Sequence, residues 1–460
     1  MHVIPAKTLL LLAGFSTLVL PAHAQYKVMA NFPGDPGLPL GSPVIAQSRG
    51  GSLVTTSLGS TAERDGQAFK MSTSGVLTDL HEFVTNDGEV VAGGLTLGRD
   101  GLFYGSALFN GPNNGGTVFQ MTAGGNVTVL HSFSEPGGNP QAAPVQSLYG
   151  DFYGTTYGND NDPNSDPGTI YKVDSAGNFT LLHTLSDYTE GANPSAPLVQ
   201  DASNFWFYGV TEHGGPNSVG SIFRVDSKGD FQVLHLFNYG DGGYPESLIQ
   251  ASDGNYYGST YLGGQYDQGV VFKMDAATHK VTVLHQFTGG SDGGGASVGF
   301  LQATDGYLYG LTANSGGGVE GGTLFRISTS GSDFKVLHTF SKSSGYIPNS
   351  LMQDTNGFLY GETCYGGTSD HGVFFRYDLG LPEFVSFLGT YGRVGMTVEI
   401  LGQNFTGDSE VSFNGVAAQV TEVQPTFIKT TVPEGATTGW ITVTTSKGTV
   451  KSNKQFIVRP

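Results

Sequence analysis

The sequence predicts an all-β protein: a seven-bladed β-propeller of four-stranded blades, followed by a C-terminal immunoglobulin-like β-sandwich. Three observations predict this class. A pattern of about 50 residues recurs through residues 25–378, each copy holds four short runs of strand-forming residues, and a different alternation of apolar residues fills residues 379–460. The 71 glycines of the chain fit the many tight turns that such short strands require.

Residues 1–24 have the features of a secretory signal peptide. Lys7 precedes an apolar run from Thr8 to Leu20, and the segment ends in the small-residue sequence PAHA. The run is too short to span a bilayer, and no later segment is long enough. We therefore expect cleavage before Gln25, no transmembrane segment, and a mature protein secreted to the periplasm or the extracellular space.

Each copy of the repeat reads as four strands in a fixed order. The order is a "VLHxF" run, a Gly/Asp/Pro-rich loop, "sLxQ", "DGxLYGxT", a variable Gly-rich loop and "GtvFk". Turn pairs such as Asp253-Gly254 separate the runs, which indicates an antiparallel meander. One such meander is one blade of a propeller.

The N-terminal segment is predicted to complete the last blade. The final copy ends at Tyr377-Asp378 without a "VLHxF" strand, whereas residues 26–32, "YKVMANF", match that strand type with Ala30 in place of the histidine. Pairing of this segment with the last copy would close the ring and remove its open edges.

Two residue types recur once in each complete copy. The "LH" histidines are His81, His131, His183, His235, His285 and His338. The "YG" tyrosines are Tyr104, Tyr153, Tyr208, Tyr257, Tyr309 and Tyr360. A single active site does not use six copies of one group, so we interpret the histidines as hydrogen-bonded scaffold groups and the tyrosines as rings that stack between blades.

Charge and motif content exclude several functions. The formal charge of −18 and the absence of a basic cluster argue against nucleic acid and anionic membranes as partners. The single cysteine, Cys364, allows no intramolecular disulfide. No Walker A loop, dinucleotide fingerprint, His-Glu-x-x-His or Gly-x-Ser-x-Gly motif is present, which argues against nucleotide cofactors and serine hydrolysis.

Candidate site residues are sought where the repeat is broken. The loop before "sLxQ" and the loop after "YGxT" emerge on the same face and vary most, so a site is expected there. Glu212 and His213, with Glu362 and His371, are the candidate acid/base residues on this face, because a His beside a carboxylate can transfer protons to a glycan. Asp241 is a candidate binding residue in the other variable loop.

One acidic loop is a candidate metal site. Oxygen side chains alternate along it, a spacing that can surround a hard cation such as Ca²⁺. The candidate ligands are Asp160, Asp162, Asn164 and Asp166. The loop lacks the glycine and distal glutamate of an EF-hand, and its prolines equally fit an ordinary surface loop.

Two family resemblances follow from longer motifs. The segment "DGGYPESLIQASDGNYYGSTYLGG" with "GVVFKMD" resembles the GloVer-type (Gloeo_Verruco) tandem repeat of secreted bacterial proteins, although Leu53-Val54-Thr55 replaces Leu-Tyr-Gly in the first copy. The segment "GQNFTGDSEVSFNGVAA" with "TVPEGATTGWITVTTSKG" resembles an IPT/TIG domain. The first resemblance implies the repeat fold and export; it carries no activity.

Three functions fit these observations. The first is a monomeric binding or scaffold protein that recognises a polysaccharide or an extracellular protein through the variable-loop face, since no catalytic motif is present. The alternative is a polysaccharide lyase or glycoside hydrolase with its site on the same face. A third is a purely structural component of the cell envelope or matrix. Fold class alone does not decide between them.

Overall fold

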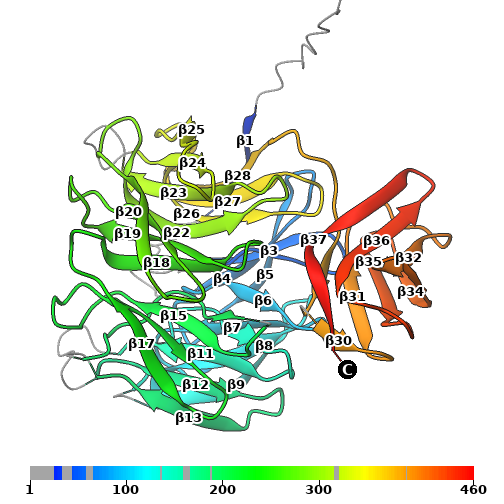
Figure 1. The fold of residues 1–460 in the computed structure, drawn as a ribbon, viewed down its shortest axis with the longest axis horizontal. Helices are drawn as coiled ribbons and strands as arrows, with labels where there is room; N and C mark the ends of the chain where they lie inside the picture. The colour runs from blue at the N-terminus through cyan, green and yellow to red at the C-terminus, as the bar shows by residue number, and fades with distance from the viewer. Residues whose placement is uncertain are drawn as a thin grey trace, which may run out of the picture.

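The computed structural model describes residues 25–33, 44–57, 66–134, 137–158, 166–186, 189–201, 203–314, 321–389 and 391–459. Every regular element in these residues is a β-strand, as the sequence predicts (Figure 1). None of them forms a helix with the length and hydropathy needed to cross a bilayer. The predicted signal peptide lies outside the described residues.

The described residues between 26 and 377 form seven four-stranded antiparallel sheets, numbered here by the chain order of the "sLxQ" strand that each contains. Sheet 1 contains β2 (Ala46–Gln47), β3 (Leu53–Ser57), β4 (Gln67–Met71) and β5 (Leu77–Glu82). Sheet 2 contains β6 (Leu95–Leu97), β7 (Phe103–Ala107), β8 (Asn114–Met121) and β9 (Val127–Ser134). Sheet 3 contains β10 (Val145–Gln146), β11 (Phe152–Thr156), β12 (Thr169–Val173) and β13 (Phe179–Thr184).

The remaining four sheets follow the same plan. Sheet 4 contains β14 (Val199–Gln200), β15 (Phe207–Thr211), β16 (Ser221–Val225) and β17 (Phe231–Leu236). Sheet 5 contains β18 (Gly243–Gln250), β19 (Tyr256–Leu262), β20 (Val270–Met274) and β21 (Val281–Gln286). Sheet 6 contains β22 (Gly294–Gln302), β23 (Leu308–Asn314), β24 (Thr323–Ile327) and β25 (Lys335–Thr339). Sheet 7 combines β26 (Tyr346–Gln353), β27 (Leu359–Tyr365) and β28 (Val373–Tyr377) with β1 (Tyr26–Asn31).

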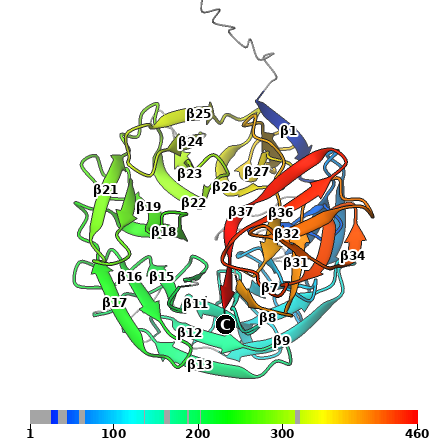
Figure 2. The ribbon, with the colours of Figure 1, turned by 45° about the vertical axis from the view of Figure 1, so that its right-hand side comes forward.

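The sheets are arranged in a ring, with the "sLxQ" strand of each sheet innermost and the "LH" strand outermost (Figure 2). First strands of neighbouring sheets contact one another, among them β18 with β22 and β22 with β26. The glycine of "YG" is required because an aromatic ring of the third strand crosses it. At Gly258 an added Cβ would lie 2.5 Å from the Phe272 ring and 2.2 Å from the Ser247 carbonyl oxygen.

Aromatic stacking and hydrogen bonds join neighbouring sheets. The "YG" tyrosines stack on the next sheet as expected in three junctions: Tyr104 on Phe152, Tyr153 on Phe207 and Tyr208 on Tyr256, with ring centroids 3.7, 3.9 and 4.2 Å apart. First-strand glutamines accept backbone N–H bonds from the preceding sheet: Gln146 from Arg99, Gln200 from Leu148, Gln302 from Ser252 and Gln353 from Thr304. These contacts fix each sheet relative to the one before it.

The N-terminal strand β1 is hydrogen bonded to β28 in sheet 7. Tyr26 stacks on His338 of sheet 6, with centroids 3.8 Å apart and rings parallel within 1°. In three other junctions the first aromatic residue of an outer strand stacks on the histidine of the preceding sheet in the same way: Phe179 on His131, Phe231 on His183 and Phe334 on His285. Gln47 of sheet 1 also donates to the Thr355 hydroxyl of sheet 7 at 2.8 Å.

Residues 386–459 form two further sheets that pack on each other. The first has the order β29 (Ser386–Leu388), β31 (Thr397–Leu401), β35 (Phe427–Thr431) and β34 (Val420–Gln424). The second has the order β30 (Tyr391–Arg393), β37 (Gly448–Arg459), β36 (Gly439–Thr445), β32 (Glu410–Phe413) and β33 (Val416–Ala418). Their shared core includes Val398, Ile400, Ile428, Ile441 and Phe456. This is the predicted C-terminal β-sandwich.

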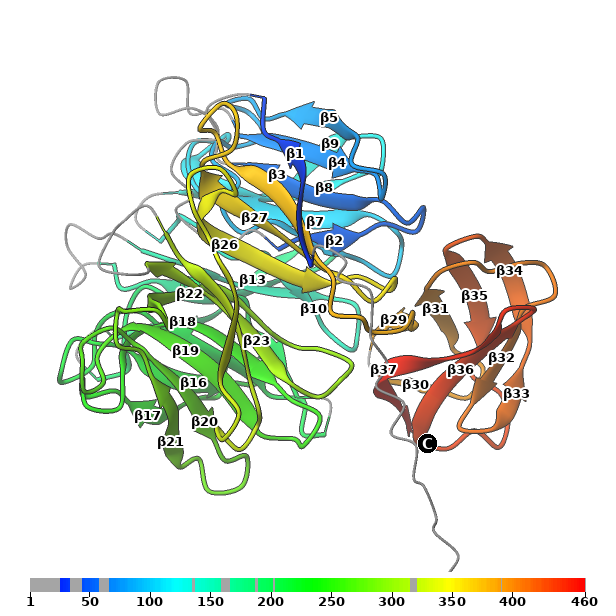
Figure 3. The same ribbon diagram turned by 90° about the horizontal axis from the view of Figure 1, so that it is seen from above.

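The sandwich packs against one side of the ring (Figure 3). It contacts the turns that join the first and second strands of several sheets. Tyr391 donates to the Leu148 carbonyl at 2.9 Å, and the Phe384 N–H donates to the Thr355 carbonyl at 2.9 Å. These turns lie on the side opposite the variable loops, since each strand reverses direction.

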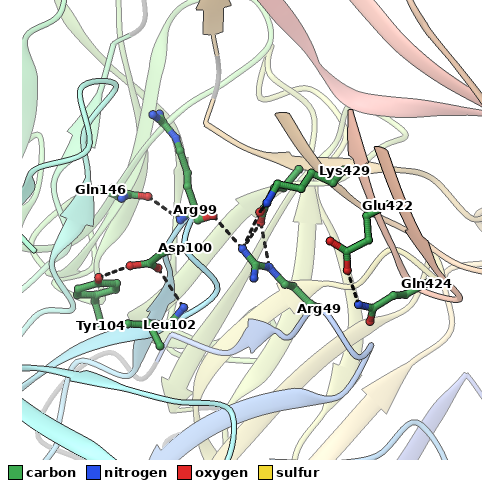
Figure 4. Close-up of polar contacts among 10 residues, drawn as sticks. Arg49, Arg99, Asp100, Leu102, Tyr104, Gln146, Glu422, Gln424 and Lys429 are labelled. Atoms are coloured by element: carbon green, nitrogen blue, oxygen red, sulfur yellow. Dashed lines mark hydrogen bonds and ion pairs between the residues drawn. The ribbon is translucent and has the colours of Figure 1, made fainter. Parts of the chain in front are cut away.

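An ion pair lies at the centre of this contact. The Arg49 guanidinium binds both carboxylate oxygens of Glu399 at 2.6 Å and donates to the Arg99 carbonyl at 2.9 Å (Figure 4). The Glu399 side chain is only 5% exposed, and Lys429 lies 3.8 Å from its second oxygen. Burial raises the pKa of Glu399, while Arg49 and Lys429 oppose that increase. The pair therefore holds a buried charge between the ring and the sandwich.

Removal of β1 tests what closes sheet 7. We expect a chain that starts after Phe32 to lose about 5 °C or more in Tm and to self-associate, because β28 becomes an open edge. Tyr26→Ala should lower stability by about 2 kcal/mol through loss of the His338 stack. Lys27→Ala, at an exposed position of the same strand, is the control. Calorimetry and light scattering report both effects, and an unchanged Tm in the truncated chain contradicts a closing role.

Substitution of Arg49 tests the buried ion pair. Arg49→Ala leaves the Glu399 carboxylate poorly paired, so we expect a loss of about 3 kcal/mol at pH 8. The pKa of Glu399 should then rise further. A carboxyl with a raised folded-state pKa is neutral below it, so the loss should be smaller at pH 5 than at pH 8. Urea unfolding at both pH values measures the difference, with Arg393→Ala at an exposed position as the control. An equal loss at both values speaks against a buried charge.

Candidate functional site

The predicted site residues fall on or beside the variable loops. Glu212 and His213 directly follow β15, Asp241 precedes β18, and His371 lies between β27 and β28. Glu362 lies within β27. These loops are on the side of the ring opposite the turns that contact the sandwich.

Glu212 and His213 belong to a cluster that spans sheets 3 to 5. Tyr157 directly follows β11, and its hydroxyl donates to Glu212 Oε2 at 2.9 Å. His213 Nε2 lies 3.8 Å from the same oxygen. Backbone bonds hold this segment: His213 exchanges two hydrogen bonds with Ala192, and the Glu212 N–H donates to the Asn193 carbonyl at 3.1 Å. The Glu212 carboxylate is thereby fixed as an acceptor between two sheets.

A second carboxyl, Glu246 on β18, faces this cluster. Burial raises the pKa of Glu246 well above its ordinary value, and the nearby Glu212 carboxylate raises it further. Glu246 occupies a bulge, because the pairing of β18 with β19 shifts between Pro245 and Ser247. Glu246 therefore holds its proton more tightly than an ordinary glutamate, beside a Glu212 carboxyl that accepts the Tyr157 hydrogen bond.

Tyrosines surround the two carboxyls. The Tyr244 ring packs edge-on against His213, with centroids 5.0 Å apart, and its hydroxyl lies 3.3 Å from the Tyr239 hydroxyl. Tyr244 has a φ of 56°, a left-handed conformation that a bulky residue rarely adopts. Tyr239, in the loop before β18, is 44% exposed; Tyr261 near the end of β19 and Tyr266 in the loop after it are 37% and 50% exposed. We call this group the loop-face cluster: Tyr157, Glu212, His213, Tyr239, Tyr244 and Glu246.

Asp241 has a contact that recurs around the ring. Its carboxylate lies 3.0 Å from Nε2 of the outer-strand His235. Equivalent pairs join His81 to Asp87, His183 to Glu190 and His285 to Asp292. This matches the interpretation of the repeated histidines as scaffold groups in four of the six copies. His131 and His338 stack on aromatic rings, as His183 and His285 also do.

Glu362 has neighbours other than the loop-face cluster, and His371 Nδ1 is buried without a hydrogen-bond partner among the described residues. Glu362 is 4% exposed, pairs in register with Ser350, and has the Thr55 side chain of sheet 1 beside it. Burial raises the pKa of Glu362 to about 8. Burial also raises the pKa of Cys364, two residues further on. The structure therefore brings Glu212 and His213 together and gives Glu362 a separate, buried environment.

The predicted metal ligands are described only in part. Asp160, Asp162 and Asn164 lie outside the described residues. Asp166 is buried, and its carboxylate accepts the Gly137 N–H at 2.7 Å. Within the described ranges no group of three or more His, Cys, Asp or Glu side chains is arranged to hold a metal ion.

Sequence reasoning found Glu212 and His213 of the loop-face cluster and missed its other four residues. At the position after "YGxT" the copies hold Leu108, Tyr157, Glu212, Tyr261, Ala313 and Cys364. After the first-strand proline they hold Gln141, Ser195, Glu246 and Asn349. Glu246 is the one acid among these four, a signal that a column-by-column comparison of the copies would have shown.

Comparisons with known proteins give the family. The Gloeobacter/Verrucomicrobia repeat matches residues 15–163, 135–314 and 207–415, and the IPT/TIG domain matches residues 382–458. No curated protein matches the chain at a significant level.

Similar solved structures include a periplasmic gluconolactonase of Pseudomonas aeruginosa, PpgL, with 15% identity, a TM-score of 0.47, and coverage of 65% of this chain and 85% of that one. Another is PorZ, a surface component of the type-IX secretion system of Porphyromonas gingivalis, with 15% identity, a TM-score of 0.49, and coverage of 94% and 61%. A third is a fungal alcohol oxidase of the AA5 family in complex with copper, with 14% identity, a TM-score of 0.49, and coverage of 92% and 98%.

These structural likenesses are too distant to carry an argument about function. The family matches are different, because the repeat model spans most of the chain and agrees with the motifs in the sequence. This protein therefore belongs to the Gloeobacter/Verrucomicrobia repeat family and carries a C-terminal IPT/TIG domain.

Proposed function

We propose that the protein is an exported, monomeric glycan-binding scaffold that binds its ligand at the loop-face cluster. In this proposal residues 1–24 are a cleaved signal peptide, and residues 25–378 form a closed seven-bladed propeller whose last blade is completed by β1. Residues 379–460 form the IPT/TIG sandwich on the opposite side. The sandwich would position the propeller, and the loop face would remain available to a polysaccharide.

The observation that carries the proposal is the union of exposed tyrosines with a fixed carboxylate on one face. Sugar rings present apolar C–H surfaces and many hydroxyls. Tyrosine offers a flat apolar face with a polar edge, and it loses little conformational entropy on binding. The Glu212 carboxylate accepts hydrogen bonds, whereas protonated Glu246 donates one. Tyr244 packs on His213, the residue after Glu212, and its hydroxyl lies 3.3 Å from the Tyr239 hydroxyl, so one sugar unit could contact rings and carboxyls together.

A second candidate function is supported by the Glu212 and Glu246 pair. Glycoside cleavage uses one protonated carboxyl as the acid and one carboxylate as the base or nucleophile. Burial and the neighbouring Glu212 carboxyl raise the pKa of Glu246, which is the direction that the acid requires. His213, at 3.8 Å from Glu212, is a further proton acceptor for lyase chemistry. A polysaccharide hydrolase or lyase would use the same cluster.

Binding can be tested on a glycan array followed by calorimetry with the best ligand. We expect Tyr244→Ala and Tyr239→Ala each to weaken binding about tenfold, which is about 1.4 kcal/mol. Tyr149 is 67% exposed but lies in a turn on the sandwich side, so Tyr149→Ala is a matched control that should keep full affinity. Equal losses in all three variants, or no ligand on the array, count against the proposed site.

The protonation of Glu246 gives a pH test. Because Glu246 has a raised pKa, it remains a donor to a higher pH than an ordinary glutamate and loses its proton as the pH rises through that pKa, so wild-type affinity should fall with rising pH. Glu246→Gln keeps an N–H donor at every pH, so its affinity should change less than that of the wild type between pH 6 and pH 9, below the range in which tyrosine ionises. Mass analysis of polysaccharide digests then separates the functions. An enzyme should release products that Glu246→Gln abolishes while it still binds, whereas a binding protein releases none.

A further inference from the structure

The turn between the first and second strands of sheet 3 carries an aromatic residue that breaks the pattern of the repeat. Four residues before the "YG" tyrosine, five of the six complete copies have an Asp or Asn side chain that hydrogen bonds to that tyrosine's hydroxyl: Asp100, Asn204, Asp253, Asp305 and Asn356. Sheet 3 has Tyr149 at this position. Tyr149 is 67% exposed, the largest exposed fraction of any large hydrophobic side chain among the described residues. The turn itself gives no reason for an aromatic residue here.

The next position of the same turn holds a second exception, in sheet 4. Every other complete copy has a glycine there, with φ between 83° and 106°: Gly101, Gly150, Gly254, Gly306 and Gly357. Sheet 4 has Phe205, which adopts the same left-handed region with a φ of 67°. A bulky residue in this region is strained and persists only where its surroundings hold it. Two neighbouring sheets therefore replace ordinary turn residues with aromatic rings.

The two rings meet a third ring from the sandwich. The centroid of Tyr149 lies 6.0 Å from that of Phe205 and 6.3 Å from that of Tyr391, and the last two lie 6.2 Å apart. Tyr391 is buried, and its hydroxyl donates to the Leu148 carbonyl. The contact between ring and sandwich thus uses Tyr391 fully and leaves most of the Tyr149 side chain exposed. We call Tyr149, Phe205 and Tyr391 the seam platform.

Two arginines from neighbouring strands of the sandwich lie at the platform. Arg459 of β37 lies over the Phe205 ring, 5.0 Å from its centroid, and donates to the Ser203 carbonyl at 3.4 Å. Arg393 of β30 is exposed and is paired in register with Arg459. Side chains paired in register lie beside each other, and like charges in such pairs repel. An anion bound between them would remove this repulsion.

A third arginine comes from sheet 2. Arg99 donates to the Leu148 carbonyl at 3.0 Å, the same oxygen that accepts the Tyr391 hydroxyl. Burial raises the pKa of Tyr391, and Arg99, Arg393 and Arg459 all oppose that increase, so the three charges lie around one ring. Among the described residues neither Arg99 nor Arg393 forms an ion pair. A chain with a net charge of −18 thus gathers positive charge at this seam from three distant points of its sequence.

We propose that the seam platform and its three arginines bind an acidic segment of a partner protein, in which one or two carboxylates stand beside an aromatic or apolar residue. Arginine binds carboxylates through two parallel hydrogen bonds, and Tyr and Arg are enriched among the residues that dominate protein interfaces. A short segment suits the charge distribution better than a long polyanion. A nucleic acid or an anionic polysaccharide that extends beyond the arginines would meet the negative charge of the rest of the chain.

This inference goes beyond the proposed glycan binding and does not depend on it. The platform lies on the sandwich side of the ring, opposite the loop-face cluster, so both ligands could be bound at once. A segment on the platform would contact the propeller through Tyr149 and Phe205 and the sandwich through Arg393 and Arg459. The protein would then join a glycan on one side to a protein on the other.

The test uses residues 25–460 and labelled synthetic peptides of ten residues, whose centre has the pattern acid–aromatic–acid. Neutral versions, in which Gln and Asn replace the acids, are the controls. By fluorescence anisotropy we expect a Kd of about 100 μM for the best acidic peptide and at least about tenfold weaker binding of its neutral version. Raising NaCl from 50 mM to 300 mM should weaken binding about fivefold, because salt screens exposed charges. Equal affinity of the acidic and neutral peptides, or no binding of any peptide, overturns the proposal.

Variants locate the peptide. Tyr149→Ala and Arg393→Glu alter exposed side chains, and each should weaken peptide binding about tenfold. Tyr239→Ala, an exposed tyrosine on the loop face, and Lys335→Glu, an exposed cation on β25, are the matched controls and should keep wild-type affinity for the peptide. Equal losses in the platform variants and in these controls contradict the site.

Two further outcomes would overturn the proposed partner. Polygalacturonate is titrated into the wild type and the Tyr149→Ala variant beside the peptides. If it binds, if Tyr149→Ala removes its binding, and if no peptide binds, the ligand is an anionic polysaccharide and the partner class is wrong. If Tyr149→Ala lowers the Tm and neither probe binds the wild type, the platform only holds the sandwich to the ring.

Discussion

The packing of one sheet onto the next is the contact on which the rest of this structure depends. Each second strand presents its tyrosine and the residue two positions later to the following sheet, because alternate side chains of a strand share a face. The glycine between them leaves room for the aromatic ring of the third strand. In several junctions this face is filled by rings that stack on the next sheet and by hydroxyls that hydrogen bond to the chain leading into it. A change at this face therefore has few ways to be accommodated, and Glu362 is the largest such change.

The N-terminal strand joins sheet 7 through the same kind of contact. Tyr26 begins the outer strand of sheet 7 and stacks on His338 of sheet 6. Phe179, Phe231 and Phe334 stack in the same way on the histidines of the sheets that precede them. The N-terminal strand thus makes the same stacking contact as these outer strands, although the rest of sheet 7 lies more than 300 residues later in the sequence. At the next junction, between sheets 7 and 1, Gln47 donates a hydrogen bond to Thr355. Non-local pairing of this kind is entropically unfavourable to form, which makes each contact at the junction more consequential.

The fold was predictable from the sequence because the same four strand motifs recur in each copy of the pattern. Seven "GtvF" runs, with "YG" and "LH" at fixed offsets, give strand order, the inner and outer positions, and the place of β1 from pattern alone. The site was predictable only where chemistry broke that pattern visibly. Glu212 and His213 stood out as an adjacent pair. Glu246 lay inside the motif that best represents the repeat, and its raised pKa depends on Glu212, 34 positions earlier in the numbering. The spacing of residues along one strand does not show which residues of a neighbouring sheet lie close to them.

Two buried carboxyls show how position decides function in a repeated scaffold. Glu246 and Glu362 both have raised pKa values for the same first cause, burial. Glu246 sits in a first-strand bulge beside another carboxyl and exposed tyrosines, so its proton is available to a ligand that arrives from solvent. Glu362 lies on a second strand between two sheets and is 4% exposed. The bulge of sheet 7 places Asn349 at the equivalent of Glu246 and aligns Ser350 with Glu362. The same bulge thus holds an acid in sheet 5 and an amide in sheet 7, while the acid of sheet 7 lies on the neighbouring strand.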